Sequence, residues 1–151
     1  MFSTVISGGL CGMETYRVSV EVDISTGLPI FNMVGLLSGE VREAKERVLV
    51  ALKNTGYDLP PRKITVNLAP ADRRKEGNGY DLPIALGILE SLGYFEKEVL
   101  ESVFVTGELG LNGEIKPVRG ILPMVKKAEE EGMRECIIPK DNAKEGAVIP
   151  G

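Results

Sequence analysis

Residues 63–89, KITVNLAPADRRKEGNGYDLPIALGIL, decide how this chain is expected to fold. Ile64, Val66 and Leu68 alternate with polar residues, which is the period of a half-buried strand. From Leu82 to Leu92 the sequence is apolar on nearly every side, as in a buried helix. The stretch therefore predicts a strand, a loop and a buried helix in succession.

The loop between these two elements is charged and rich in glycine. Pro70 should end the strand, and residues 73–79, RRKEGNG, cannot form a core and should be exposed. Asp81 is a suitable N-cap for the helix, and Pro83 is tolerable in its first turn. A charged loop that leads into a buried helix is where an α/β protein tends to place function, so this loop is the first candidate site.

The residues before this stretch predict three strands. We predict them at 2–7, 16–24 and 28–34, and apolar and polar residues alternate most regularly in the second. Gly8 and Gly9 should form a turn after the first. The short turn at 26–27 predicts that the second and third strands form an antiparallel hairpin.

Helical spacing and turn residues define the remaining elements. Apolar residues from Val41 to Leu52 predict an amphipathic helix, with Ser38 as its N-cap and Gly56 just past its end. Further expected elements are strands at 103–109, 113–118 and 135–139, a helix from Ile121 to Ala128, and a final helix capped by Asp141. Strands first in a run and then alternating with helices indicate an α/β (α+β) fold, a mixed sheet with helices packed on it.

Composition excludes several kinds of chemistry. The 151 residues carry a net charge of −4, which argues against a basic surface over the whole domain, although a local basic patch is compatible with it. The absence of histidine removes Ser-His and Cys-His catalysis. Cys11 and Cys136 have no zinc-ligand spacing, so no metal site is expected. No apolar run is long enough to span a membrane, and we expect a cytoplasmic protein.

Three stretches resemble one known family. They are 27–36 (GLPIFNMVGL) with 41–48 (VREAKERV), 67–72 (NLAPAD) with 80–85 (YDLPIA), and 107–120 with 138–142 (IPKDN). Together they resemble the N-terminal domain of the YifB/ComM family of magnesium-chelatase-like AAA+ ATPases. The chain departs from the family pattern at Leu37, where a proline is common, and in the basic pair Arg73 and Arg74.

This resemblance implies a single Lon-like domain over residues 1–151, cut from a longer AAA+ protein. The implied protein is a hexameric motor that acts on DNA, with branch migration during natural transformation as a role of some members. ATP and Mg²⁺ would belong to the longer protein and not to this part, which lacks a GxxxxGK[ST] motif. The implied partners are its own AAA+ domain, neighbouring protomers and DNA.

The domain is similar in turn to the proteolytic domain of Lon, which has a ribosomal protein S5 domain 2-like fold. Lon-type proteases use a Ser-Lys dyad. Gly79 stands at the position of the serine and Leu122 at that of the lysine, and a one-residue slip offers only Asn78 or Tyr80. The resemblance therefore implies no catalytic residue. Two alternatives remain open, a degenerate Lon-type peptidase and a component of a magnesium-chelatase-like metal-insertion complex.

Two local features have competing interpretations. Arg73, Arg74 and Lys75 could contact DNA phosphates, since clustered cations release counterions, or contact a neighbouring domain or subunit. They could equally be a solvated loop. Glu108 could pair with a cation across the cleft that corresponds to the Lon active site, or be a plain exposed strand residue.

Overall fold

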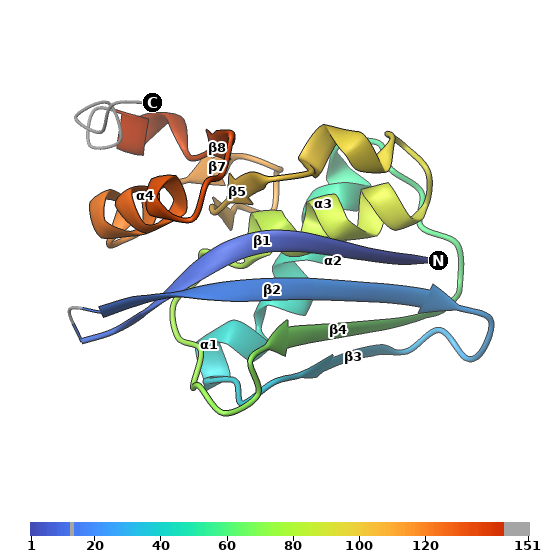
Figure 1. Cartoon of the computed structure of the whole chain (residues 1–151). Coiled ribbons are helices and arrows are strands. Elements are labelled where there is room, and N and C mark those ends of the chain that lie inside the picture. Colours follow the sequence, from blue (N-terminus) through green and yellow to red (C-terminus); the bar gives the residue numbers. More distant parts are fainter. Residues whose placement is uncertain (13, 144–151) are drawn as a thin grey trace.

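The protein has an α/β (α+β) fold, in which helices pack on a mixed sheet, as expected from the sequence (Figure 1). The computed structural model describes residues 1–12 and 14–143. In chain order the elements are β1 (Phe2–Cys11), β2 (Glu14–Ser25), β3 (Phe31–Val34), α1 (Gly39–Arg42), α2 (Ala44–Asn54), β4 (Lys63–Ala69), α3 (Asp81–Ser91), the short 3-10 helix η1 (Lys97–Leu100), β5 (Val103–Val105), β6 (Glu108–Leu109), β7 (Ile115–Lys116), α4 (Ile121–Glu130), β8 (Glu135–Ile137) and the 3-10 helix η2 (Lys140–Asn142).

The main sheet has six strands in the order β3-β4-β2-β1-β5-β8. Its centre is antiparallel, because β2 pairs with β1 on one edge and with β4 on the other. The outer pairs β3–β4, β1–β5 and β5–β8 are parallel. β6 and β7 form a separate two-stranded sheet.

The order of the strands corrects two expectations. β1 continues through Gly8 and Gly9 to Cys11, so these glycines form no turn. β3 is shorter than the predicted strand and pairs in parallel with β4, not in a hairpin with β2. The hairpin is instead β1–β2, and since β1 and β4 occupy both edges of β2, no edge of β2 is left for β3.

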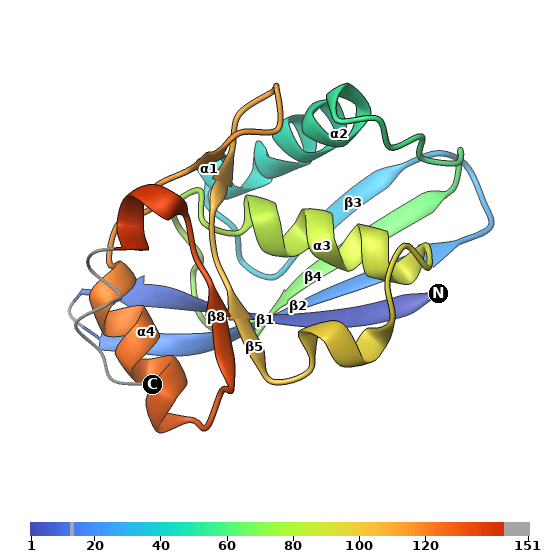
Figure 2. The same cartoon turned by 90° about the horizontal axis from the view of Figure 1, so that it is seen from above.

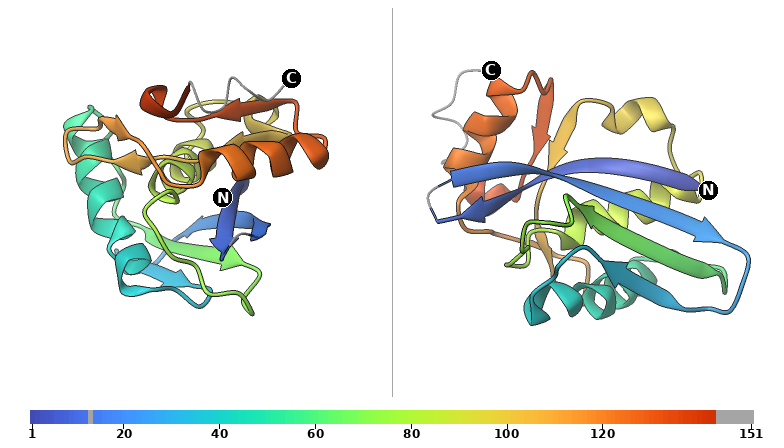
Figure 3. Two further views of the ribbon diagram at one scale, coloured as in Figure 1. Left: turned by 90° about the vertical axis from the view of Figure 1, so that its left-hand side faces the viewer. Right: turned by 60° about the horizontal axis from the view of Figure 1, so that its bottom comes forward.

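α2 and α3 cover one face of the sheet, where Ser3 of β1 bonds to Gly87 of α3, whereas α4 places Met124 beside Gly8 on the opposite face of β1. Seen from above, α2 and α3 lie side by side, and α4 lies over the far tips of β1 and β2 (Figure 2). Within the described part of the chain, the other face of β4 and β3 carries no helix (Figure 3). The alternating residues Val18, Val20 and Val22 of β2 are fully buried, because they point from the sheet towards the helices.

Most helix predictions are confirmed, with three corrections. Ser38 caps α1 by accepting a hydrogen bond from the Val41 amide, but the predicted helix is broken at Glu43 into α1 and α2. The N-cap of α3 is Tyr80 and not Asp81. The N-cap of η2 is Pro139 and not Asp141, and residues after 143 lie outside the described part of the chain.

The strand predicted at 103–109 is two strands, β5 and β6, because the chain leaves the main sheet after Val105. β7 and β8 are shorter than the strands predicted around them. In residues 1–12 and 14–143, no helix combines the length and the apolar character that crossing a bilayer requires.

Helix α3 packs closely on the sheet at Gly87. A Cβ atom at this position would lie 2.6 Å from Cγ2 of Val22 in β2, closer than side chains tolerate. We expect Gly87→Ala to lower the free energy of unfolding by about 1–3 kcal/mol, although alanine is the better helix former. Urea denaturation measures this.

Gly39→Ala is the matched control for that substitution. A Cβ atom at Gly39, in the first turn of α1, meets no atom within 4 Å. This variant should be neutral or more stable than the parent by up to about 1 kcal/mol. Equal effects of the two substitutions would contradict the close approach of α3 to β2.

Candidate functional site

A buried ion pair joins α2 to the first residue of α3. Asp81 has a fully buried side chain, and Arg47 reaches it from α2 with one fifth of its side chain exposed. The Arg47 Nε donates to Oδ2 of Asp81 at 2.6 Å, and Nη2 donates to Oδ1 at 3.0 Å. The Leu109 amide of β6 also donates to Oδ2, at 3.0 Å. Asp81 therefore joins three elements and does not cap α3.

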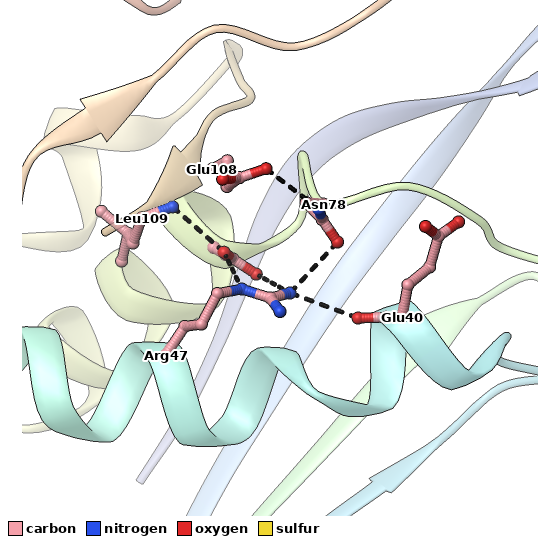
Figure 4. Close-up of polar contacts among 6 residues, drawn as sticks. Glu40, Arg47, Asn78, Glu108 and Leu109 are labelled. Carbon is pink, nitrogen blue, oxygen red and sulfur yellow. Dashed lines mark hydrogen bonds and ion pairs between the residues drawn. The ribbon is translucent and has the colours of Figure 1, made fainter. Parts of the chain in front are cut away.

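The same guanidinium positions the loop before α3 (Figure 4). Arg47 Nη2 donates to Oδ1 of Asn78 at 3.3 Å and to the Glu40 backbone carbonyl at 3.2 Å. Asn78 in turn donates from Nδ2 to Oε1 of Glu108 at 2.9 Å. The Glu40 carboxylate accepts from the Gly77 amide at 2.6 Å. Glu108 is therefore half-buried and bonded to an amide, not a plain exposed strand residue, and its charge contributes to raising the pKa of Arg47.

Burial and charge act against each other at the ion pair. Burial raises the pKa of the Asp81 carboxyl, while the Arg47 guanidinium and the Leu109 amide oppose the rise by stabilising the carboxylate. The hydrogen bonds to Asp81 raise the pKa of Arg47. We assign the pair as ionised, because the two parallel N–H···O contacts match a guanidinium and a carboxylate.

The prediction that Lys75 is exposed is wrong. Its side chain is fully buried, and its ammonium donates to the backbone carbonyls of Gly35, at 2.6 Å, and of Pro70. Burial lowers the pKa of this ammonium, which the charge of Asp72 opposes. The ammonium of Lys75 thereby joins the residues that directly follow β3 and β4.

The two arginines before Lys75 are exposed, as expected. The Arg73 guanidinium lies over the ring of Tyr16, 4.9 Å from its centroid. Arg74 forms an exposed ion pair with Glu76, with 3.3 Å between Nε and Oε1. Arg73 and Arg74 therefore remain accessible to a ligand, whereas Lys75 could not reach one without leaving its site.

The loop from Glu76 to Tyr80 forms one wall of a cleft of about 600 Å³. The end of β1 forms a second wall, and Thr106 and Glu108 also line the cleft. The remaining wall is the segment that leads into α4. The lining residues are Gly8, Gly9, Leu10, Glu40, Glu76, Gly77, Asn78, Gly79, Tyr80, Thr106, Glu108, Pro117, Val118, Arg119 and Met124.

Gly79, at the position that corresponds to the Lon serine, lies in this cleft. A Cβ atom there would lie 2.6 Å from Oγ1 of Thr106. Thr106 is buried, and its hydroxyl donates to the Gly79 carbonyl at 3.1 Å. A serine at residue 79 would therefore have to displace Thr106 before its hydroxyl could face the cleft.

Sequence reasoning did not predict the Arg47–Asp81 pair. Arg47 is one of several charged residues on the exposed side of a helix, and 34 positions separate it from Asp81. The spacing of residues carries no signal for a contact of this kind. The one available hint was Asp81 itself, an acidic residue directly before the apolar run from Leu82 to Leu89.

Comparison with known proteins finds extensive similarity. Residues 20–142 match the family model described as subunit ChlI of Mg-chelatase. The chain is 41% identical to competence protein ComM of Haemophilus influenzae over 145 residues, covering 96% of this chain and 28% of ComM. It is 42% identical to the uncharacterized protein YifB of Escherichia coli over 149 residues, covering 99% of this chain and 29% of YifB.

A third relative bears on the fold. The chain is 31% identical to the archaeal Lon protease of Pyrococcus abyssi over 119 residues, covering 78% of this chain and 12% of the protease. The predicted Lon protease-like α/β fold is therefore confirmed. The chain spans less than a third of the length of ComM and YifB.

The ion pair should be costly to break from one side. We expect Arg47→Met to lower the free energy of unfolding by about 3–5 kcal/mol, because it leaves the Asp81 carboxylate buried without its cation. Arg47→Lys keeps the charge but not the planar guanidinium that bonds both carboxylate oxygens, so it should lower the free energy of unfolding by less. Guanidinium chloride denaturation compares the variants.

Arg74→Met is the matched control, since it breaks an exposed ion pair by the same chemical change. It should alter the free energy of unfolding by less than about 1 kcal/mol. A loss at Arg47 no greater than the loss at Arg74 would show that the buried pair does not stabilise the fold.

Proposed function

Because this chain belongs to the family that unites the ChlI subunit of Mg-chelatase with ComM and YifB, we propose that it is the non-catalytic N-terminal module of a ComM/YifB-type AAA+ ATPase that acts on DNA. The name of ComM, a competence protein, supports a role in DNA uptake or its processing. The module assists assembly of the motor or guides DNA to it.

The geometry of Gly79 carries the non-catalytic part of this proposal. Thr106 occupies the space into which a nucleophilic side chain would extend, and its hydroxyl is held by the Gly79 carbonyl. Leu122, at the position of the Lon lysine, cannot act as a base. Among the residues that line the described cleft there is no lysine, which a Ser-Lys type of mechanism requires.

In this proposal ATP hydrolysis lies outside residues 1–151. ATP and Mg²⁺ would bind to the AAA+ domain of the longer protein, and six protomers would form the working ring in the cytoplasm. The length of ComM and YifB, more than three times the matched segment, supports a further domain. A DNA-stimulated ATPase activity of the full-length gene product, lost when its nucleotide-binding lysine is replaced, is the direct test.

Arg73 and Arg74 are the residues we propose for DNA contact. Both are exposed on the loop between β4 and α3, and Arg73 is held in place by stacking on Tyr16. Lys75 is removed from this set, because its ammonium is committed to backbone carbonyls. A variant that included Lys75 would lose stability and would not report on DNA contact alone.

The double variant Arg73→Ala/Arg74→Ala should weaken DNA binding in a salt-dependent way. Loss of two phosphate contacts makes the negative slope of the logarithm of the DNA association constant against the logarithm of the salt concentration shallower by about 1.8. Fluorescence anisotropy with a labelled forked duplex, titrated at several salt concentrations, measures the slope. The matched control is Lys53→Ala/Lys126→Ala, which removes two exposed cations from α2 and α4. Equal slopes for the two double variants would exclude Arg73 and Arg74 as the contact.

The relation to Lon supports a second candidate, a degenerate peptidase. We expect no cleavage when the chain is incubated with fluorescently labelled unfolded casein, because Gly79 and Leu122 supply neither nucleophile nor base. An active Lon protease is the positive control. Release of casein fragments that increases with the concentration of the chain would overturn the non-catalytic assignment.

The match to ChlI supports a third candidate, a part in metal insertion. In the described residues no group of three His, Cys, Asp or Glu side chains is placed to hold a metal ion. In this candidate the chain would therefore act through assembly with other subunits. Titration with protoporphyrin and Mg²⁺ separates it from the DNA-acting proposal, which expects no binding of either.

A further inference from the structure

One edge of β1 is unpaired where it enters the cleft. β2 pairs with one edge of β1 along all ten residues. β5 pairs with the other edge of β1 at one position, where Phe104 lies opposite Ile6. In the described chain no strand pairs with this second edge from Gly8 to Leu10, and these same residues line the cleft. The edge is therefore open to a further strand.

Side chains of other elements lie beside these residues of β1. Gly8 and Gly9 carry no side chain of their own, and Phe104 and Met124 lie beside Gly8, Tyr16 beside Gly9, and Gly120 beside Leu10. A neighbouring strand needs a spacing of about 4.8 Å and an unobstructed row of backbone groups. The cleft volume of about 600 Å³ is within the range of ligand-binding sites.

The charge of the cleft favours a cationic occupant. Glu40 and Glu108 each use one carboxylate oxygen, Glu40 for the Gly77 amide and Glu108 for Asn78. Within the described residues, the second oxygen of each has no hydrogen bond. Glu76 also lines the cleft and is paired with Arg74 outside it, while Arg119 is the one cation among the lining residues. Arg47 lies beside Glu40 and Asn78, and its charge is paired with that of Asp81.

From this arrangement we propose that the cleft binds an extended polypeptide segment of a partner protein, which adds to the free edge of β1 and places a lysine or arginine side chain between Glu40 and Glu108. The backbone of the segment supplies hydrogen bonds to the edge, and its cationic side chain supplies specificity. No covalent step is involved.

A nucleic acid fits this cleft less well than a polypeptide. Phosphates would face the carboxylates of Glu40 and Glu108, and the repulsion between like charges opposes their entry. Arg73 and Arg74, proposed for DNA contact, do not line the cleft. The two proposals therefore concern different surfaces, and either one can fail without the other.

The test uses the 151-residue chain and a fluorescein-labelled probe, acetyl-Ser-Val-Thr-Lys-Val-Thr-Ser-amide. Anisotropy should show binding, and the same peptide with Glu in place of Lys should bind at least about tenfold more weakly. A third probe, N-methylated at alternate residues, should not bind because it cannot pair with a strand edge. In NMR spectra the amide signals of Gly8, Gly9 and Leu10 should shift with the Lys probe.

Variants of the protein complete the test. Glu108→Gln keeps an oxygen for Asn78 but removes the charge, and it should weaken binding of the Lys probe about tenfold. Glu40→Gln should act in the same direction. Glu114→Gln, an equal change at an exposed residue of the β6–β7 turn outside the cleft, should leave binding unchanged.

Several outcomes would overturn the proposal. They are absence of binding of the Lys probe, equal binding of the Lys and Glu probes, and amide shifts confined to residues away from β1. Displacement of the probe by a single-stranded oligonucleotide, with shifts at the same three amides, would identify the cleft as a nucleic-acid site instead.

Discussion

The contact between Arg47 and Asp81 fixes the part of the molecule where the cleft lies. Asp81 begins α3, Arg47 belongs to α2, and the Leu109 amide belongs to β6, so one carboxylate joins three elements that are distant in sequence. Through Asn78 the same guanidinium also fixes the loop before α3. A buried carboxylate is costly unless a cation and hydrogen-bond donors stabilise it, and this requirement makes the geometry of these elements mutually dependent.

The loop from Arg73 to Gly79 is held at both ends. Lys75 attaches its beginning to the carbonyls that follow β3 and β4, and Asn78 attaches its end to the Arg47 network. The loop exposes the charged side chains of Arg73, Arg74 and Glu76 on either side of Lys75. Such a loop resembles a preorganised recognition surface more than a moving lid, because ordering it on binding would cost little further entropy.

The sequence predicted the helices and strands of this fold better than it predicted which strands pair and which side chains meet. The period of β2 and β4 and the cap of α1 are local signals, and signals of this kind located most helices and strands. The pairing of β3 depends on which strand edges are already occupied, which no local pattern reveals. The site was missed for a related reason. Lys75 and Asp81 look like exposed or capping residues until their partners, carbonyls and an arginine from other elements, are known.

The burial of Lys75 has a consequence for the chemistry of the chain during its synthesis. An acyl-transfer reagent or an acetylating enzyme can reach this amine only before the loop closes, because the folded protein leaves none of the side chain exposed. Once acylated, the nitrogen would lose its charge and its fit to the carbonyls of Gly35 and Pro70. Acylation at Lys75 would therefore identify molecules that were modified before they folded. The acylated fraction would rise with the time that the chain spends unfolded in the presence of the reagent.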